Sequence, residues 1–251
     1  MSGNSPAPTL QARALTRRFD GLVAVSQVSL DLHVGQIHAV IGTNGAGKST
    51  LVNMLSGEIA VSEGAVLHDG DDITRLPQHK RARAGIGRSY QRTTIFPAFT
   101  ALENCRLTAQ ASRQRPWRVF ESAQHCNYSV SVAHQVLQVA GLDAVADRIA
   151  GSLSHGQKRQ LEIAMCLSTN PRVLLLDEPL AGMGAEEVER MLALLEQLKR
   201  NHAILLIEHD MDAVFRVADR ITVMVNGEVI ASDVPERIRD NAEVQLAYLG
   251  E

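Results

Sequence analysis

Short apolar runs alternate with longer stretches of helical periodicity along most of the chain. Residues 25–34 alternate apolar and polar side chains, which is typical of a half-buried strand. Compact apolar runs of strand length occur at residues 36–41, 173–176, 204–207 and 221–225. Residues 186–200 carry apolar side chains at helical spacing between two of these runs. Because the strands of a parallel sheet are buried on both faces, this pattern predicts an α/β fold with a parallel central sheet.

Two parts of the chain depart from this alternation. The pair Asn226-Gly227 directly follows an apolar run and predicts a tight hairpin into a further strand. Residues 101–150 show helical periodicity but no run typical of a central strand. We therefore expect a helical subdomain, at about residues 92–170, inserted into a single domain that spans residues 9–251. Residues 1–8 are small and polar, and we expect them to form a flexible tail.

The composition is that of an ordinary soluble protein. Apolar residues make up 45% and charged residues 21% of the 251 positions, and the net charge is −3 at pH 7. This balance gives no reason to expect nucleic acid as a partner. The three cysteines are widely spaced and form no Cys-x-x-Cys pair, which favours packed residues or free thiols in a reducing cytosol. No run of about 18 apolar residues occurs, so a membrane role requires another protein.

Positive charge is nevertheless concentrated in one stretch. Six basic residues fall close together, namely Arg75, Lys80, Arg81, Arg83, Arg88 and Arg92. A solvated basic surface and a docking site for a partner both fit this pattern.

Residues 42–49 have the pattern of a phosphate-binding loop. The stretch Gly42-Thr-Asn-Gly-Ala-Gly-Lys-Ser49 fits G-x-x-x-x-G-K-[ST], and it lies between a predicted strand and a predicted helix. Glycines let backbone N–H groups turn toward phosphates, and the start of a helix favours anions. Lys48 is expected to contact the β- and γ-phosphates and Ser49 to bind Mg²⁺. A glycine-rich turn without a ligand is the alternative, which the matching context disfavours. The expected nucleotide contacts are Asn44, Gly45, Ala46, Gly47, Lys48, Ser49 and Thr50.

Two adjacent acids, Asp177 and Glu178, end a later apolar run and resemble the Walker B motif of nucleotide hydrolases. Asp177 is expected to hold the metal or its waters, and Glu178 to polarise the attacking water. Such an acidic pair is usually only solvated when it stands alone. Together with a phosphate loop upstream, it favours an enzyme that hydrolyses ATP with Mg²⁺.

The stretch Leu153-Ser-His-Gly-Gln157, directly before a helical run, resembles the signature motif of ATP-binding cassette (ABC) proteins, usually Leu-Ser-Gly-Gly-Gln. Further motifs of that family stand in order around it. Gln91 resembles the Q-loop glutamine, His209 the switch histidine, and Phe19 the aromatic residue that stacks on adenine. The resemblance extends over residues 10–249. It implies a P-loop NTPase core with a parallel central sheet, an antiparallel β subdomain and an inserted helical subdomain.

The resemblance also assigns roles. Two such domains bind head to tail and enclose two ATP molecules, each between the phosphate loop of one chain and the signature motif of the other. Ser154, Gly156 and Gln157 then contact the γ-phosphate of the opposite site, since a helix start favours anions. The implied metal ligands are Ser49, Gln91 and Asp177. The implied catalytic residues are Lys48, Gln91, Glu178 and His209. The resemblance further implies nucleotide contacts by Phe19, which would stack on the adenine, and by Val25.

Simpler alternatives exist for several of these residues, and the chain departs from the family pattern twice. Gln91 would ordinarily be a surface residue, His209 a cap of the next helix, and Phe19 a core residue. His155 replaces the first signature glycine and adds a side chain at a crowded interface. Gly184 stands where many members have an aspartate, which leaves open the hydrogen bond that this aspartate makes across the dimer.

The stretches 153–164, 177–183 and 247–251 resemble the ATPases of branched-chain amino acid importers. This resemblance implies a second ATPase chain, two integral-membrane permeases and, indirectly, a periplasmic solute-binding protein as partners. It also implies a place at the cytoplasmic face of a bacterial inner membrane. An export ATPase of the lipopolysaccharide type and a non-transport ATPase, such as one for iron–sulfur assembly, are the alternatives.

Three apolar residues, Ile95, Phe96 and Phe99, follow Gln91 on a short stretch interrupted by proline. Apolar side chains grouped on a loop commonly mark a partner site, so we expect this stretch to grip a helix of the permease. The alternative is that the three side chains pack inward between two subdomains.

Overall fold

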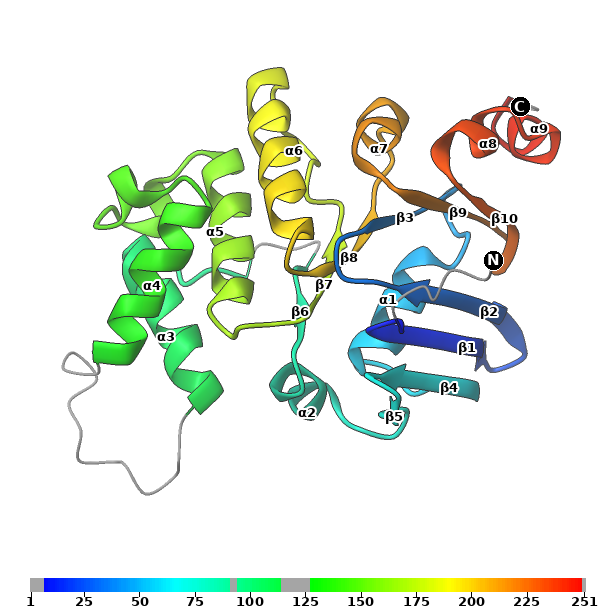
Figure 1. Cartoon of the computed structure of the whole chain (residues 1–251), viewed down its shortest axis with the longest axis horizontal. Coiled ribbons are helices and arrows are strands. Elements are labelled where there is room, and N and C mark those ends of the chain that lie inside the picture. Colours follow the sequence, from blue (N-terminus) through cyan, green and yellow to red (C-terminus); the bar gives the residue numbers. More distant parts are fainter. Residues whose placement is uncertain (1–6, 91–93, 114–126, 250–251) are drawn as a thin grey trace.

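The computed structural model describes residues 7–90, 94–113 and 127–249, and Figure 1 shows their arrangement. The described strands are β1 (Leu10–Phe19), β2 (Leu22–Leu32), β3 (Ile37–Gly42), β4 (Glu63–His68), β5 (Asp71–Asp72), β6 (Ile86–Arg88), β7 (Val173–Asp177), β8 (Ala203–Ile207), β9 (Arg220–Val225) and β10 (Glu228–Asp233). The described α-helices are α1 (Lys48–Ser56), α2 (Gln78–Arg83), α3 (Ala101–Arg113), α4 (Asn127–Val139), α5 (His155–Leu167), α6 (Ala185–Lys199), α7 (Met211–Val217), α8 (Pro235–Arg239) and α9 (Ala242–Leu249).

A six-stranded sheet in the order β10-β9-β3-β8-β7-β6 forms the centre of the molecule. All its neighbouring strands run parallel except β10, which pairs antiparallel with β9. Every residue of β3, β7 and β8 is buried, as the apolar runs predict. Asn226 and Gly227 both have positive φ, 49° and 84°, which the predicted tight turn between β9 and β10 requires. The α/β prediction is confirmed.

A second, antiparallel sheet has the order β2-β1-β4-β5. Helix α1 lies between the two sheets (Figure 1), and its apolar side chains share one core with both. The buried side chains that α1 contributes are Leu51, Val52, Met54 and Leu55. Because α1 starts at residue 48, this core fixes the helix whose first turn carries the predicted phosphate loop.

The helices α3, α4 and α5 pack together at one end of the molecule, on the left of Figure 1. They share a core with α6, which covers one face of the central sheet. Two single 3₁₀ turns, η2 (Asp143–Val145) and η3 (Ala150–Ser152), connect α4 to α5. Helices α3, α4 and α5 and both 3₁₀ turns lie within residues 92–170, for which the sequence predicts an inserted helical subdomain, whereas α6 lies outside that range. Among the described residues, no helix is both long and apolar enough to cross a membrane.

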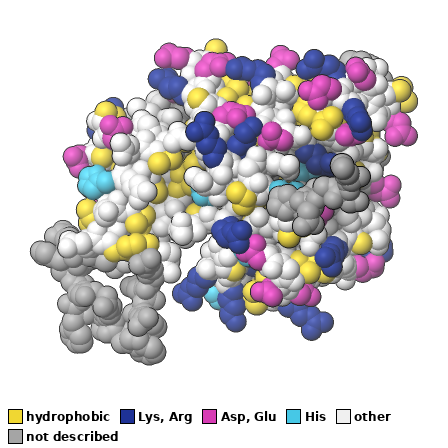
Figure 2. All heavy atoms as spheres, in the orientation of Figure 1, with side chains coloured by type: hydrophobic (Ala, Val, Ile, Leu, Met, Phe, Trp, Pro, Cys, Tyr) yellow, Lys and Arg dark blue, Asp and Glu magenta, His cyan; other side chains and the backbone are white. Residues whose placement is uncertain are grey.

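The basic stretch is only partly a surface. Figure 2 shows Lys and Arg side chains gathered along the lower edge of the molecule, near α2 and the neighbouring strands. Arg81, however, is 1% exposed, and its guanidinium donates to the carbonyl oxygens of Met54, Leu55, Thr74 and Leu76. The side chain of Arg88 is also largely buried. For these two residues the expectation of a solvated or docking surface is wrong, because each guanidinium serves internal acceptors.

Candidate functional site

The predicted phosphate loop links β3 to α1 and forms one wall of a cavity of about 440 Å³. Gly47, the residue before α1, has a φ of 95°, and a Cβ there would stand 2.4 Å from the carbonyl oxygen of Ala24. Only glycine fits this close approach, which brings the loop against β2. The cavity is lined by Leu22, Val23, Ala24, Asn44, Gly45, Ala46, Gly47, Lys48, Ser49, Thr50, Glu178, His209 and Asn226. All seven residues predicted from the loop pattern therefore line it.

The amino group of Lys48 is folded back over its own loop. Lys48 is 6% exposed, and its Nζ donates to the carbonyl oxygens of Gly42 at 2.7 Å and Thr43 at 3.0 Å. Burial lowers the pKa of this amine, and the nearby carboxylates of Glu178 and Asp177 oppose that shift. The amine therefore lies over the loop with its hydrogen bonds made to backbone oxygens of that loop.

Glu178 and His209 face this loop from the ends of two neighbouring strands, β7 and β8. The Oε1 atom of Glu178 lies 2.6 Å from the Nε2 atom of His209. Glu178 has a φ of 51°, a left-handed conformation that costs about 1–3 kcal/mol in a non-glycine residue. Strain of this kind is concentrated at functional sites. The arrangement places a hydrogen-bonded carboxylate–imidazole pair in the wall of the cavity.

Asp177 directly precedes Glu178 in the chain, but it does not line the cavity. Its side chain is buried, and its Oδ1 atom has no hydrogen-bond partner among the described residues. Burial raises the pKa of this carboxyl, with the charge of Glu178 adding to the effect, while Arg88 opposes both. A buried carboxylate oxygen without a donor fits a cation ligand. In the described part of the chain no three His, Cys, Asp or Glu side chains converge to hold a metal.

Glu208, which none of the predicted motifs includes, accepts a hydrogen bond from the backbone of His209. It is 4% exposed, and its carboxylate accepts from the backbone N–H of Leu180 at 2.7 Å and of His209 at 3.2 Å. Burial raises the pKa of Glu208 to about 7. This residue therefore ties the turn after Glu178 to the turn that carries His209. Its place directly after an apolar run was the only sequence signal for it.

The signature-like stretch lies at the start of α5 and lines no part of this cavity. Ser154 caps the helix, and its backbone and side chain exchange hydrogen bonds with Gln157. The carboxylate of Glu187, at the start of α6, accepts from Ser154 Oγ at 3.0 Å. A Cβ on Gly156 would stand 2.5 Å from the carboxyl carbon of Glu187. An anionic group of the same chain thus occupies the space above this helix start.

The two departures from the family pattern lie next to each other. The ring of His155 contacts the segment after Glu178, where its Nε2 atom lies 2.9 Å from the carbonyl oxygen of Ala181. Gly184 precedes α6 and its N–H donates to Glu187 at 3.4 Å. The added histidine side chain is therefore accommodated against its own chain.

Two predicted nucleotide contacts, Phe19 and Val25, do not line the cavity. Val25 is fully buried in the core beneath the loop, and Leu22, Val23 and Ala24 line the cavity instead. The side chain of Val25 lies directly beneath the loop, because a Cβ on Gly47 would stand 3.2 Å from its Cγ2 atom. Phe19 is exposed but does not line the cavity, and the guanidinium of Arg17 covers its ring at 4.4 Å.

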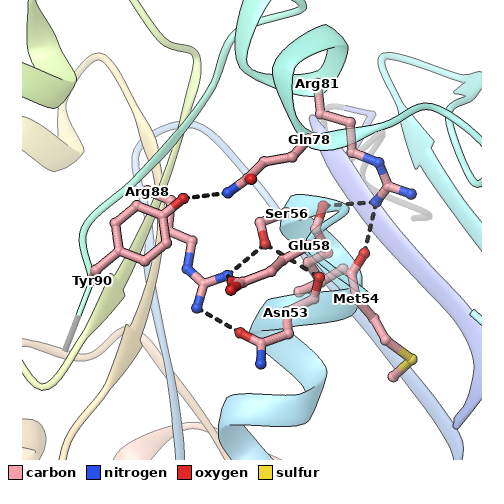
Figure 3. A network of polar contacts seen from close by, with 9 residues as sticks. Asn53, Met54, Ser56, Glu58, Gln78, Arg81, Arg88 and Tyr90 are labelled. Carbon is pink, nitrogen blue, oxygen red and sulfur yellow. Dashed lines mark hydrogen bonds and ion pairs between the residues drawn. The ribbon is translucent and has the colours of Figure 1, made fainter. Parts of the chain in front are cut away.

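Gln91 lies outside the described residues, but the strand that leads to it is firmly attached (Figure 3). The Nη1 atom of Arg88 donates to Ser56 Oγ at 2.7 Å and to Glu58 at 2.5 Å, and its Nη2 atom donates to Asn53 at 2.5 Å. Its guanidinium also stacks on the Tyr90 ring at 4.7 Å. The end of α1 therefore holds the chain three residues before Gln91.

Comparisons with known proteins agree with this geometry. The family model described as ABC transporter matches residues 25–181. The chain is 40% identical to the high-affinity branched-chain amino acid transport ATP-binding protein BraF of Pseudomonas aeruginosa, over 97% of this chain and 98% of that protein. It is 38% identical to the corresponding protein LivG of Escherichia coli, with the same coverage. The solved structure of an ATP-binding cassette of an ABC transporter in its ADP conformation matches with a TM-score of 0.84 at 29% identity, over 97% of this chain and 99% of that one.

Proposed function

Because the chain belongs to the ABC transporter family and is an ATPase of that family, we propose that it powers the import of branched-chain amino acids. The observation that carries the proposal is the cavity in which the phosphate loop faces the hydrogen-bonded pair of Glu178 and His209. The names of the two relatives favour import over export or a non-transport role.

The chemistry requires a water in line with the γ-phosphate. Glu178 orients this water and accepts its proton. The water oxygen forms a bond to the γ-phosphorus while the bond to the β–γ bridging oxygen breaks, which gives ADP and inorganic phosphate. Lys48 and the N–H groups of its loop stabilise the charge on the phosphate oxygens. His209 holds the Glu178 carboxylate and contacts the γ-phosphate.

Mg²⁺ fits the acceptor groups of the site. Ser49 and Asp177 would hold it, with Gln91 as a further ligand from outside the described residues. When bound, the ion neutralises charge on the β- and γ-phosphates. Asp177 is suited to this task because its buried Oδ1 atom lacks a donor in the described part of the protein.

A second chain completes each site in this proposal. Ser154, Gly156 and Gln157 line no part of their own cavity, and the proposal assigns them to the ATP of another copy, which would displace the Glu187 carboxylate from this turn. In the assembly, two such chains act with two integral-membrane permeases at the cytoplasmic face of a bacterial inner membrane. A periplasmic binding protein delivers the solute to the permeases.

The loop after Gln91 has properties suited to contact with the permease. Phe96 and Phe99 are 48% and 41% exposed, and their rings lie 5.8 Å apart. The buried Asn104 holds the backbone of Phe96 by accepting from its N–H at 2.7 Å and donating to its carbonyl at 3.1 Å. Ile95 instead packs against the helical core. A backbone fixed by buried hydrogen bonds therefore presents two exposed aromatic rings, as an anchoring surface does.

Uptake of radiolabelled leucine in cells that lack the native gene tests the proposal. Complementation with the wild-type chain should restore uptake, and Glu178→Gln should not. Phe96→Asp should also abolish uptake, while the isolated protein keeps its basal ATPase activity within a few-fold. Glu236→Gln, on the exposed surface of α8, is the matched control and should behave as wild type. Active wild-type ATPase with no effect on leucine uptake would contradict import of this solute class.

A further inference from the structure

Two charged residues of α5 contact the chain on both sides of residues 91–93. The Nη1 atom of Arg159 donates to the carbonyl oxygen of Tyr90 at 2.9 Å. The Oε1 atom of Glu162 accepts from the backbone N–H of Thr94 at 2.7 Å. The two side chains are also paired, with Arg159 Nη1 lying 2.9 Å from Glu162 Oε2. One ion pair on one helix thus holds both flanks of Gln91.

Burial makes this pair unusual. Arg159 is 7% and Glu162 is 3% exposed. Removing two charges from water costs free energy that their mutual attraction often fails to recover, so a buried ion pair is a weak device for stability. This pair does something that apolar side chains of the same size cannot do. It supplies a donor to a backbone carbonyl and an acceptor to a backbone N–H, and these two groups belong to residues four positions apart in the chain.

The position of the pair on α5 gives it a functional meaning. Ser154 and Gly156 form the first turn of the same helix, and Arg159 follows Ser154 by five residues, or about 7.5 Å along the helix axis. On its other side, the chain before Gln91 is held to the end of α1 by Arg88 (Figure 3). Tyr90 and Thr94 are therefore held to the helix that starts at the signature-like turn, and Arg88 is held to the helix that starts at the phosphate loop.

We propose that Arg159 and Glu162 are positioning residues that hold the flanks of Gln91 to α5, so that this segment and the first turn of α5 move together. The inference rests on the proposed function, in which Gln91 lies at one ATP and the first turn of α5 contacts the other. A change at Gln91 is then transmitted to the turn that meets the second chain. Without the pair, the phosphate loop would still bind ATP and the first turn of α5 would keep its own contacts. The two would no longer be held in a fixed position relative to each other.

Hydrogen exchange at the Thr94 amide and ATP-driven association test this proposal together. Glu162→Ala removes the acceptor, and exchange of the Thr94 amide should accelerate about tenfold or more, as loss of a charge-assisted hydrogen bond predicts. The dissociation constant of ATP for the monomer should stay within twofold, because the phosphate loop is untouched. ATP-driven dimer formation and kcat should each fall about tenfold. Glu162→Gln keeps a carbonyl acceptor and should restore most of the Thr94 protection.

A swapped pair separates this role from simple ion pairing. The double variant Arg159→Glu with Glu162→Arg restores opposite charges but sets an acceptor against the Tyr90 carbonyl and a donor against the Thr94 N–H. It should therefore fail to recover dimer formation. Glu189→Ala, which removes the exposed pair with Arg216, is the control and should leave exchange and turnover unchanged.

Several outcomes would overturn the proposal. Unchanged Thr94 exchange in Glu162→Ala would remove the contact on which it stands. Faster exchange with normal dimer formation and kcat would leave the contact without a positioning role. Recovery by the swapped pair would show that the charges alone matter. If Glu162→Ala does not fold, the comparison of Glu162→Gln with the swapped pair decides. A wild-type protein without ATPase activity would instead refute the proposed function, while the exchange measurement would still test the contact.

Discussion

The two helix starts that carry the predicted phosphate contacts differ in what already occupies them. At α1, the loop and the Lys48 amine line a cavity of about 440 Å³ together with Glu178 and His209. At α5, the carboxylate of Glu187 stands above the first turn and accepts from Ser154 Oγ. Hydrogen bonding to Ser154 lowers the pKa of Glu187, so this carboxylate is ionised at neutral pH.

This difference suggests an order of events. In the proposed dimer, the phosphates of ATP would meet no carboxylate at the start of α1. At the start of α5, a phosphate of the ATP bound by the other chain would have to replace the Glu187 carboxylate, which carries the same sign of charge. The loop before α1 would therefore bind its phosphates directly, whereas the first turn of α5 would first have to release the Glu187 carboxylate. Binding of ATP to one chain should precede association of two chains.

The largest expected effect concerns the acid beside the α1 site. Glu178→Gln removes the proton acceptor and should lower kcat by about 10²- to 10⁴-fold. ATP binding should survive, because the phosphate loop is unchanged. Steady-state hydrolysis and fluorescent nucleotide titration check the two halves of this prediction. Turnover near the wild-type rate would remove Glu178 from its role.

Lys48→Ala should affect binding at the same site. The amine now donates to the carbonyls of Gly42 and Thr43, and its loss removes the charged donor that phosphates would take over. A charge-assisted hydrogen bond contributes about 1.5–3 kcal/mol, so the dissociation constant of ATP should rise about 10- to 100-fold. Isothermal titration of the monomer gives this constant. An unchanged value would contradict the ready-made character of the α1 site.

The α5 site is tested by neutralising its carboxylate. Glu187→Gln keeps an oxygen that can accept from Ser154 but removes the negative charge, so ATP-driven dimers should form about two- to fivefold more readily. Light scattering with the hydrolysis-deficient Glu178→Gln background measures the association. Glu186→Gln changes the neighbouring acid, whose side chain is 87% exposed, and serves as the control. Weaker association of Glu187→Gln would show that the charge helps the second chain to bind.

The smallest expected effect is a pH dependence of stability that arises from Glu208, the residue before His209. The pKa of Glu208 rises from about 4.5 in the unfolded chain to about 7 in the folded protein because the carboxyl is buried, with Glu178 and Asp210 adding to the shift and the N–H donors of Leu180 and His209 opposing it. Between these values the folded state binds more protons than the unfolded state, so this group's contribution to stability decreases as the pH rises.

Glu208→Gln should therefore flatten the decline of the unfolding free energy between pH 4.5 and 7. Urea unfolding at a series of pH values measures the slope. An equal slope in both proteins would assign the dependence to other groups. The α5 site, which Glu208 does not contact, should not contribute to the difference.

Some of this structure could be predicted because local pattern and tertiary position coincide. The strands β3, β7 and β8 are wholly buried, so an apolar run was sufficient to locate them. The carboxyl ends of neighbouring parallel strands meet at one edge of the sheet. The acids at the end of β7 and the histidine after β8 are therefore expected to lie close together. The family that these motifs predict is confirmed by the matching family model and by the 40% identity to a relative.

Other features depend on contacts between distant segments and left no local signal. Val25 is implied as a nucleotide contact by the family resemblance, but its side chain packs in the core beneath the phosphate loop. Arg159 and Glu162 look like a solvated i, i+3 pair on a helix, and only the fold brings Tyr90 and Thr94 against them. The roles of Phe19, Gln91 and the α5 turn stay predictions, because they require a nucleotide or a second chain.

The burial of Arg81 has a consequence for the thermodynamics of ATP binding. Its guanidinium holds the carbonyls of Met54 and Leu55 at the end of α1 and those of Thr74 and Leu76 in the loop before α2. Helix α1 is thus anchored at the end opposite the predicted phosphate loop by contacts within the chain itself. Binding then requires little ordering of the helix, so less of the interaction free energy is lost as conformational entropy. We expect nucleotide association to show a small entropic penalty and a phosphate loop whose helix is already protected from hydrogen exchange in the free chain.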